Sequence, residues 1–234
     1  MAVPMSLIGD NLKRTRRRIE TAAQRAGRDP DEITLIAVSK TVSIERMVEA
    51  VEAGETHFGE SYVQETRVKF ASPLLNSPEL TWHFIGHLQS NKAKEVISRF
   101  SLVHSVDTLS LAKEIAKQSA KAGHITPILL EAKIDPAETK HGFPPEQILE
   151  FAAQVREFPG IELRGLMGMA TYAAPENVIR TQFRTLKTLF DALPERDRQV
   201  LSMGMSNDFE IAIEEGATHL RVGTTLFGER IYNE

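Results

Sequence analysis

A lysine at position 40 is the residue of this 234-residue chain whose type and setting first suggest chemistry. It closes the segment Ile33–Lys40, in which largely apolar, β-prone residues are followed by Ser39 and then by the amine. No acid is adjacent in the sequence, so partial burial would disfavour the ammonium form and lower the pKa of Lys40. A lysine of that kind can form a Schiff base with a carbonyl compound. The alternative is a lysine at the rim of a sheet that extends its amine into solvent.

Small and hydroxyl-bearing residues near the other end of the chain suggest a second kind of chemistry. Ser206, Gly223 and Thr224 suit a phosphate group, because glycine lets the backbone approach and hydroxyl groups donate hydrogen bonds. Each of them alone is more typical of a turn or a helix cap. Together with Lys40 they indicate a ligand that carries an aldehyde and a phosphate. Pyridoxal 5′-phosphate and the phosphorylated sugar of an aldolase both meet this description.

Arg221 could distinguish these two ligands through its placement. If its side chain points toward the phosphate loop, it would meet the ring nitrogen of a pyridoxal group lying between Lys40 and that loop. An arginine keeps its proton, so the ring nitrogen would stay unprotonated and the ring would be a poor electron sink. The alternative is an arginine that points outward and forms a salt bridge.

Short apolar runs alternate with amphipathic stretches along nearly the whole chain, and this alternation predicts strands and helices in turn. The expected strands are Ile33–Ser39, Thr56–Phe58, Trp82–Ile85, Leu102–Val106, Ile128–Ile134, Glu162–Met167, Val200–Met203 and Leu220–Val222. The expected helices are Ser6–Ala26, Ile44–Ala53, Tyr62–Phe70, Asn91–Phe100, Leu109–Ala122, Glu146–Glu157, Glu176–Leu193 and Asn207–Glu215.

Eight strands in strict alternation with helices favour a closed, parallel (β/α)8 barrel of the TIM type, preceded by an extra N-terminal helix. We expect one domain over residues 1–234, because no linker or second-domain signal is visible in the sequence. In such a barrel the reactive groups follow the carboxyl ends of the strands. Lys40, Ser206 and Arg221 would therefore meet at one end of the barrel.

The composition argues against several classes of function. The 28 basic and 32 acidic side chains nearly balance, at a net charge of −4, so neither nucleic acid nor membrane is expected as a partner. The chain has no cysteine, which excludes disulfides and thiol catalysis. No signal peptide or membrane span is visible, so the cytoplasm is the expected location. The basic run Lys13–Arg18 is more typical of a solvated helix face than of a partner site.

We expect no metal site from the histidines that the sequence brings close. His83 and His87 have the spacing of an H-x-x-x-H pair, but they lie on an expected strand and loop and lack the glutamate of a zinc protease. Buried or hydrogen-bonded histidines are the simpler interpretation. The two methionines of the segment Leu166–Ala170 are more typical of packing than of cofactor contact.

Seven segments in this order resemble the pyridoxal phosphate homeostasis protein family. They are AVSK at Ala37–Lys40, FGESYVQE at Phe58–Glu65, WHFIGHLQSNK at Trp82–Lys92, KHGF at Lys140–Phe143, LRGLMGM at Leu163–Met169, LSMGMSND at Leu201–Asp208 and RVGTTLFGER at Arg221–Arg230. The resemblance spans nearly the whole chain. It implies a single barrel of the alanine racemase N-terminal-domain type, which is fold type III among pyridoxal phosphate proteins.

The resemblance also implies the ligand and its contacts. Pyridoxal phosphate would be held as an aldimine on Lys40, with its phosphate on Ser206, Gly223 and Thr224 and its ring nitrogen facing Arg221. Met203 and Met205 would lie near the cofactor. The family usually has asparagine near the ring at the position of Ser61, and this shorter hydroxyl would lose or lengthen that contact.

Such proteins are regarded as carriers or regulators of the cofactor that influence amino-acid and keto-acid pools, and no reaction is established for them. The resemblance therefore implies a monomer without catalytic residues, with apoenzymes that depend on the cofactor as candidate partners. A slow monomeric amino-acid racemase is the alternative. It would need a second acid or base opposite Lys40, for which Tyr62 and Tyr172 are candidates and Tyr232 lies at the tail. A Schiff-base aldolase is the third interpretation.

Overall fold

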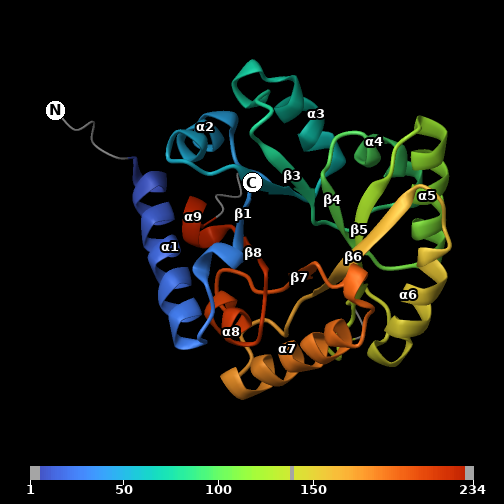
Figure 1. Ribbon diagram of the computed structural model, residues 1–234. Helices are drawn as coiled ribbons and strands as arrows, with labels where there is room; N and C mark the ends of the chain where they lie inside the picture. The colour runs from blue at the N-terminus through green and yellow to red at the C-terminus, as the bar shows by residue number, and fades with distance from the viewer. Residues whose placement is uncertain (1–5, 138–139, 230–234) are drawn as a thin grey trace.

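Eight parallel strands close into a barrel in the computed structural model, which describes residues 6–137 and 140–229 (Figure 1). The strands are β1 Thr34–Val38, β2 His57–Glu60, β3 Thr81–Phe84, β4 Leu102–Val106, β5 Thr126–Ala132, β6 Ile161–Gly168, β7 Val200–Ser202 and β8 His219–Val222. Each strand pairs with its neighbour in the sequence, and β1 closes the ring against β8. The (β/α)8 architecture predicted from the alternation is confirmed.

Helices surround the barrel on the outside, as Figure 1 shows. They are α1 Leu7–Arg25, α2 Ile44–Glu52, α3 Val63–Ala71, α4 Ala93–Ile97, α5 Leu109–Ala122, α6 Ile148–Arg156, α7 Glu176–Asp191, α8 Phe209–Glu214 and α9 Thr224–Phe227. The helix expected over Asn91–Phe100 is shorter in the structure, because a 3₁₀ turn at Ser90–Lys92 takes up its start. None of the helices in the described ranges is long and apolar enough to cross a membrane.

Strand β2 continues two residues beyond the expected end at Phe58, and glycine explains why. Gly59 lies in this extension, although glycine usually weakens a strand. In the barrel, a Cβ at Gly59 would lie 2.9 Å from the side chain of Ile85 and 3.0 Å from that of Ile36. The missing side chain therefore makes room for two neighbours, and β2 reaches Glu60 beside the cavity described below.

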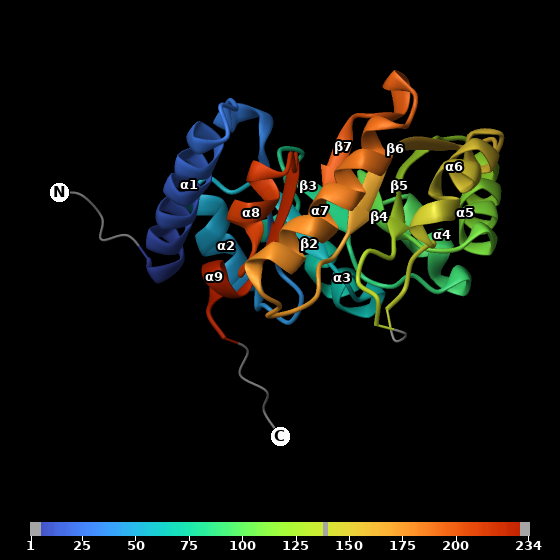
Figure 2. The same ribbon diagram turned by 90° about the horizontal axis from the view of Figure 1, so that it is seen from below.

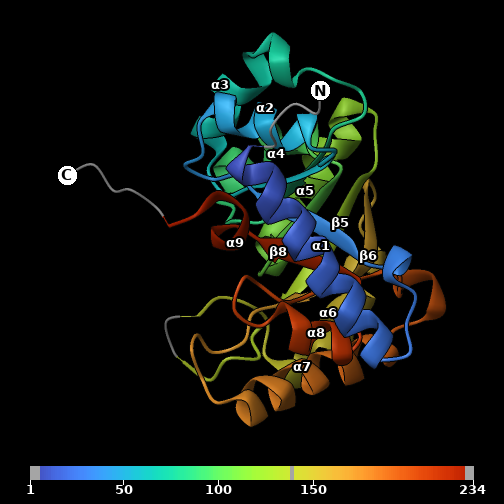
Figure 3. The same cartoon turned by 90° about the vertical axis from the view of Figure 1, so that its left-hand side faces the viewer.

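Helix α1 runs along one side of the barrel beside α2, α8 and α9, as the side views in Figures 2 and 3 show. Its start is capped by Ser6, whose Oγ accepts a hydrogen bond from Gly9 N–H at 3.2 Å. Its inner face buries apolar side chains such as Ile8, Leu12 and Ile19. The expected opening helix is therefore an outer layer of the barrel.

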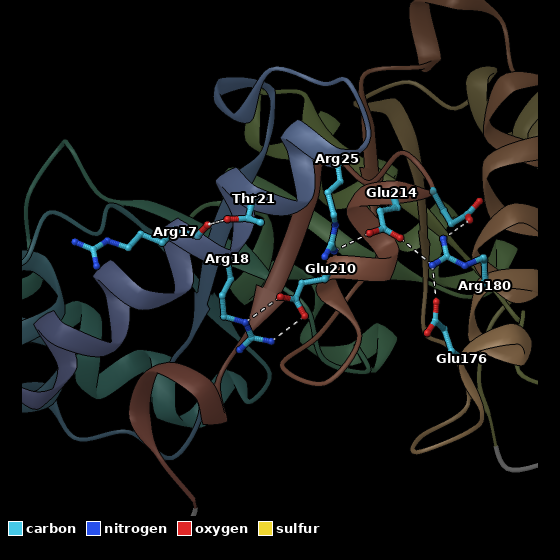
Figure 4. A network of polar contacts seen from close by, with 9 residues as sticks. Arg17, Arg18, Thr21, Arg25, Glu176, Arg180, Glu210 and Glu214 are labelled. Atoms are coloured by element: carbon cyan, nitrogen blue, oxygen red, sulfur yellow. Dashed lines mark hydrogen bonds and ion pairs between the residues drawn. The ribbon is translucent and has the colours of Figure 1, made fainter.

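Ion pairs fix α1 to α8 and α8 to α7 (Figure 4). Arg18 donates two hydrogen bonds to the Glu210 carboxylate, at 3.1 and 3.0 Å. Arg25 lies 2.7 Å from Glu214, whose other oxygen accepts a hydrogen bond from Arg180 at 2.8 Å. Within the basic run 13–18, Arg18 is thus engaged in the molecule's own contacts.

Apolar side chains form two separate packing regions. The larger lies around the strands and the surrounding helices and contains residues such as Phe58, Phe84 and Phe183. A second, smaller cluster is formed by residues of β4, β5, β6 and β7, namely Leu102, Leu129, Met167 and Val200. The smaller cluster therefore packs the four neighbouring strands β4 to β7 against one another.

Four histidines from β2, β3, β4 and β8 occupy another part of the strand framework. His57 Nδ1 lies 3.1 Å from His83 Nε2, and His83 Nδ1 lies 3.0 Å from His104 Nε2. His219 packs edge-on against both His83 and His104, with ring centroids 6.1 and 6.5 Å apart. Neutral imidazoles suit this series of hydrogen bonds, because each ring offers one donor and one acceptor.

Burial opposes protonation of these histidines. It lowers the pKa of His83 and His104 well below the ordinary value and lowers the pKa of His219 to about 4. Between an unfolded pKa of about 6.5 and a folded pKa of about 4, the unfolded chain binds a proton at His219 that the folded chain does not. The contribution of His219 to stability is therefore present above pH 6.5 and is lost as the pH falls.

The variant His219→Asn removes this titration and keeps a polar group that can reach Thr218 Oγ1, which lies 3.0 Å from His219 Nδ1. We expect the difference in unfolding free energy between wild type and variant to shrink by up to about 3 kcal/mol between pH 6.5 and pH 4. Urea unfolding at several pH values measures this difference. A difference in unfolding free energy between wild type and His219→Asn that stays constant from pH 6.5 to pH 4 would contradict the placement of His219.

Candidate functional site

A cavity of about 330 Å³ brings together most of the residues that the sequence singled out. It lies at the carboxyl ends of the strands, where (β/α)8 barrels carry their functional groups. Seven of the eight candidate residues line it, namely Lys40, Ser61, Met205, Ser206, Arg221, Gly223 and Thr224. The eighth, Met203, is completely buried in the core and is not among the lining residues.

Lys40 enters this cavity because side chains alternate along β1. Ile36, Val38 and Lys40 share one face of the extended segment, and Val38 also lines the cavity. Lys40 itself is half-buried in the turn that follows the strand. Its side chain thus belongs to the cavity wall.

The next residue, Thr41, adopts a left-handed backbone conformation with φ of 64°. This is unusual for a β-branched residue and costs on the order of 1–3 kcal/mol. Ala173, which lines the same cavity, has φ of 54°, and these two are the only non-glycine residues with positive φ in the described ranges. One of these two residues thus lines the cavity, and the other directly follows Lys40, which lines it.

A buried ion pair holds the backbone on both sides of Lys40. Lys69 Nζ donates to Glu60 Oε1 at 2.6 Å and to the Ser39 carbonyl at 2.7 Å. Glu65 Oε2 accepts a hydrogen bond from Thr41 N–H at 2.8 Å and lies 3.5 Å from Lys69 Nζ. The lysine of α3 and its two carboxylates therefore fix the residues before and after Lys40.

Glu60 is the most constrained member of this network. Its side chain is completely buried, and Ser39 Oγ donates a further hydrogen bond to Oε1 at 2.6 Å. Oε2 is the one buried side-chain polar atom in the described residues without a hydrogen-bond partner. Burial raises the pKa of Glu60, and the charge of Lys69 acts in the opposite direction.

Arg221 enters the cavity from β8 in a fixed orientation. Its Nη1 donates to Ser202 Oγ at 2.6 Å, and its Nη2 donates to the Gly168 carbonyl at 3.0 Å. Ser202 Oγ also lies 2.9 Å from His104 Nδ1, so the histidine chain ends at this arginine. Burial lowers the pKa of Arg221 to about 10, and the charges of Glu131 and Asp208 oppose that shift. The guanidinium therefore remains charged near neutral pH.

Two backbone N–H groups converge on the hydroxyl of Ser206. Gly223 N–H donates to Ser206 Oγ at 3.2 Å, and Thr225 N–H donates to it at 3.4 Å. A Cβ at Gly223 would meet its nearest neighbour, Val38, only at 3.4 Å, so packing alone does not require glycine there. Backbone N–H groups that converge in this way can donate hydrogen bonds to the oxygens of an anion.

The remaining walls come from loops after β2, β3 and β6. A Cβ at Gly86 would lie 2.4 Å from the Ser61 carbonyl oxygen, so glycine lets these two loops touch and helps to position Ser61. Met169 and Tyr172 follow β6 and line the cavity, whereas Tyr62 is exposed and is not among the lining residues. Met169 is thus placed at the cavity, where the sequence suggested only packing.

Several features of the site were not evident from the sequence. From the sequence we named Thr224 but missed the N–H group of Thr225, because residue type does not show which backbone N–H groups face a site. Asp208 also lines the cavity, and burial raises its pKa. Burial and the nearby charge of Asp107 raise the pKa of Glu131 to about 7. Arg230 and Tyr232 lie outside the described residues.

A barrel of this topology, with a lysine after β1 and hydrogen-bond donors after β8, has counterparts among known proteins. The family model described as alanine racemase, N-terminal domain, matches residues 11–231. The pyridoxal phosphate homeostasis protein of Aquifex aeolicus is 41% identical over 227 residues, which cover 95% of this chain and 98% of the relative. That of Escherichia coli K12 is 40% identical, over 98% of this chain and all of the relative. The chain belongs to the pyridoxal phosphate homeostasis protein family.

Solved structures agree with this assignment. PipY of Synechococcus elongatus, in a structure with pyridoxal phosphate bound, superposes with a TM-score of 0.77 at 35% identity and covers 90% of this chain and 100% of PipY. A protein of unknown function from Bifidobacterium adolescentis reaches 0.87 at 35% identity, over 94% of both chains. Alanine racemase of Clostridium difficile 630 reaches 0.74 at 17% identity over 98% of this chain and 60% of the racemase, which shows a shared fold only.

The ion pair beside Lys40 gives a direct test of how this loop is held. We expect Lys69→Met to lower the unfolding free energy by about 3–5 kcal/mol, because it leaves the Glu60 carboxylate buried and unpaired. The double variant Lys69→Met/Glu60→Gln should recover much of that loss, because no uncompensated charge remains. Denaturant unfolding of the single and double variants measures both effects.

The matched control is Lys187→Met, which removes an exposed lysine paired with Asp191 four residues on. Exposed pairs of this kind contribute only about 0.3–0.5 kcal/mol. A loss at Lys69→Met no larger than at Lys187→Met would mean that the Glu60 pair does not hold this loop.

Proposed function

We propose that this chain binds pyridoxal 5′-phosphate covalently through Lys40 and serves as a carrier or regulator of that cofactor. The observation that carries the proposal is the cavity that Lys40 shares with Ser206, Gly223 and Arg221. The cofactor offers an aldehyde for the amine, a phosphate for the donors of the loop and a ring nitrogen for the arginine. The names of the relatives and the cofactor bound to PipY support the same ligand.

The residues present fit this group. The N–H groups of Gly223 and Thr225 and the hydroxyls of Ser206 and Thr224 would hold the phosphate. Gly223 has no side chain to cover its N–H, so a phosphate oxygen could approach the backbone closely there. Met205, with Met203 behind it, and Ser61 would lie beside the ring, as the family resemblance implies. The hydroxyl of Ser61 replaces the usual asparagine contact with a weaker one.

Arg221 supports binding rather than catalysis. The bound cofactor supplies an electron sink that depends on protonation of its ring nitrogen. A guanidinium can donate a hydrogen bond to that nitrogen, but it has no acceptor atom, so it cannot stabilise a proton on the nitrogen as a carboxylate would. Ser202 and the Gly168 carbonyl keep Arg221 in this orientation. We infer that carbanion chemistry is weak at this site and that the protein is not primarily an enzyme.

The wider assignments follow from this proposal. We propose that residues 1–234 act as one cofactor-binding domain, that the protein works as a monomer in the cytoplasm, and that apoenzymes dependent on the cofactor are its partners. Through them it would affect amino-acid and keto-acid pools. The near balance of charge favours neither a nucleic-acid nor a membrane role.

The direct test is the absorption spectrum of protein mixed with pyridoxal phosphate. Wild type should develop the visible band of a covalently bound cofactor, and Lys40→Ala should lose it because the attacking amine is gone. Lys117→Ala, which removes an exposed lysine of α5, is the matched control and should match wild type. A band of equal strength in Lys40→Ala would refute the attachment site.

A slow amino-acid racemase is the second candidate, favoured by the alanine-racemase fold and by Tyr172 at the cavity. Exchange of the amino-acid α-proton in deuterated buffer separates the two functions. We expect cofactor-loaded wild type to exchange this proton no faster than an equal concentration of free pyridoxal phosphate. Faster exchange that Tyr172→Phe abolishes would establish the racemase instead.

A further inference from the structure

Three side chains from separate loops converge at the barrel mouth, apart from the residues that line the cavity. His87 follows β3, Asp107 follows β4, and His141 lies in the loop after β5. His87 Nδ1 lies 3.0 Å from Asp107 Oδ2, and His141 Nδ1 lies 3.8 Å from the same oxygen. One nitrogen or oxygen of each residue falls within 4.8 Å of the others. None of the three is used in the proposed cofactor site.

We propose that His87, Asp107 and His141 bind one divalent transition-metal ion of the Zn²⁺ class. Such an ion takes histidine nitrogens at about 2.0–2.1 Å and carboxylate oxygens at about 2.0–2.2 Å, which places neighbouring donors roughly 3–3.5 Å apart in a tetrahedral site. The observed separations of 3.0 and 3.8 Å lie close to that spacing. The donor atoms of the two histidines lie within 4.8 Å of each other, so the proposed ion requires these side chains to move closer together.

The chemistry of the donors selects the class of ion. Two imidazoles and one carboxylate suit Zn²⁺ and its neighbours Co²⁺, Ni²⁺ and Cu²⁺, whereas Mg²⁺ and Ca²⁺ prefer oxygen ligands alone. The His87 and His141 rings stack with centroids 4.4 Å apart and planes 21° apart, so both can direct Nδ1 to the same side. Three protein ligands leave a further coordination position for water or another small ligand.

Burial and charge favour a cation at this position. The Asp107 side chain is only 4% exposed, and its carboxylate repels the nearby Glu131. A divalent cation would offset that repulsion. The side chains of His87 and His141 are 48% and 60% exposed, so an ion can enter from solvent. The site thus combines a buried anionic base with two accessible nitrogens.

The backbone around two of the ligands is held in place before any ion binds. Phe143 N–H donates to the Glu131 carbonyl at 2.8 Å, and Lys133 N–H donates to the Phe143 carbonyl at 2.9 Å. Gly142 has φ of +118°, and a Cβ there would lie 2.8 Å from Lys133 N. These contacts tie the loop that carries His141 to the end of β5.

The loop that carries His87 is held in a similar way. Ser105 Oγ donates a hydrogen bond to the carbonyl of Gly86, which precedes His87, and links this loop to β4. Asp107 follows directly on the last residue of β4. Because Asp107 directly follows a strand and the hydrogen bonds above hold backbone next to His87 and His141, little ordering is needed when the ion binds.

Titration calorimetry of the full chain with ZnCl₂, on protein without a histidine tag, tests this proposal. We expect one Zn²⁺ per chain, and a loss of affinity of at least about 100-fold in His87→Ala and in His141→Ala, since even the outer partners of a metal ligand matter by 10–100-fold. Both histidines are half-exposed, so neither variant should disturb the fold. CoCl₂ should give the visible absorption of a protein-bound cobalt site in wild type only.

The matched control is His124→Ala, which removes a histidine at the end of α5 that contacts the Ile97 carbonyl at 3.0 Å. It should bind Zn²⁺ like wild type, and so should Lys40→Ala, because the metal site does not depend on the cofactor. No Zn²⁺ binding by wild type, or equal affinity in wild type, His87→Ala and His141→Ala, would overturn the proposal. A loss confined to His124→Ala would overturn it as well.

Discussion

The buried ion pair between Glu60 and Lys69 is the interaction on which the arrangement of this site depends. It joins α3 to the end of β2 and fixes the Ser39 carbonyl, while Glu65 fixes Thr41 N–H. The turn between those two contacts carries the lysine and includes a threonine in a strained left-handed conformation. Strain of this kind persists only where surrounding contacts determine the backbone. The backbone on both sides of Lys40 is thereby held next to the cavity.

A polar network among the strands holds Arg221 in a similar way. Three histidines are linked by hydrogen bonds to Ser202, which accepts a hydrogen bond from Arg221. The contacts of the histidine rings suit neutral imidazoles. This network orients a charged guanidinium that is almost completely buried. A polar network of this kind is favourable only when its members are satisfied, so it fixes the arginine in one orientation. The network therefore holds the Arg221 guanidinium in one orientation at the cavity.

Local sequence patterns predicted the fold and most of the cavity. Lys40 and the residues after β7 and β8 were recognisable because strand ends in a parallel barrel converge, whatever their separation in the chain. The predicted strand Thr56–Phe58 ended two residues before β2 does, and only the packed barrel shows that Ile36 and Ile85 need the space beside Gly59. The Glu60–Lys69 pair, Thr225 N–H and the cluster of His87, Asp107 and His141 were missed. They depend on tertiary contacts that no local spacing encodes, and the sequence led us to expect no metal site.

Attachment of the cofactor to Lys40 is the central claim, and borohydride trapping tests it most directly. Wild-type protein loaded with pyridoxal phosphate is reduced with sodium borohydride, digested and mapped by mass spectrometry. We predict one stable phosphopyridoxyl modification per chain, on the peptide that contains Lys40. Modification mainly at another lysine, such as Lys69 or Lys133, or an unmodified Lys40 peptide, would contradict it.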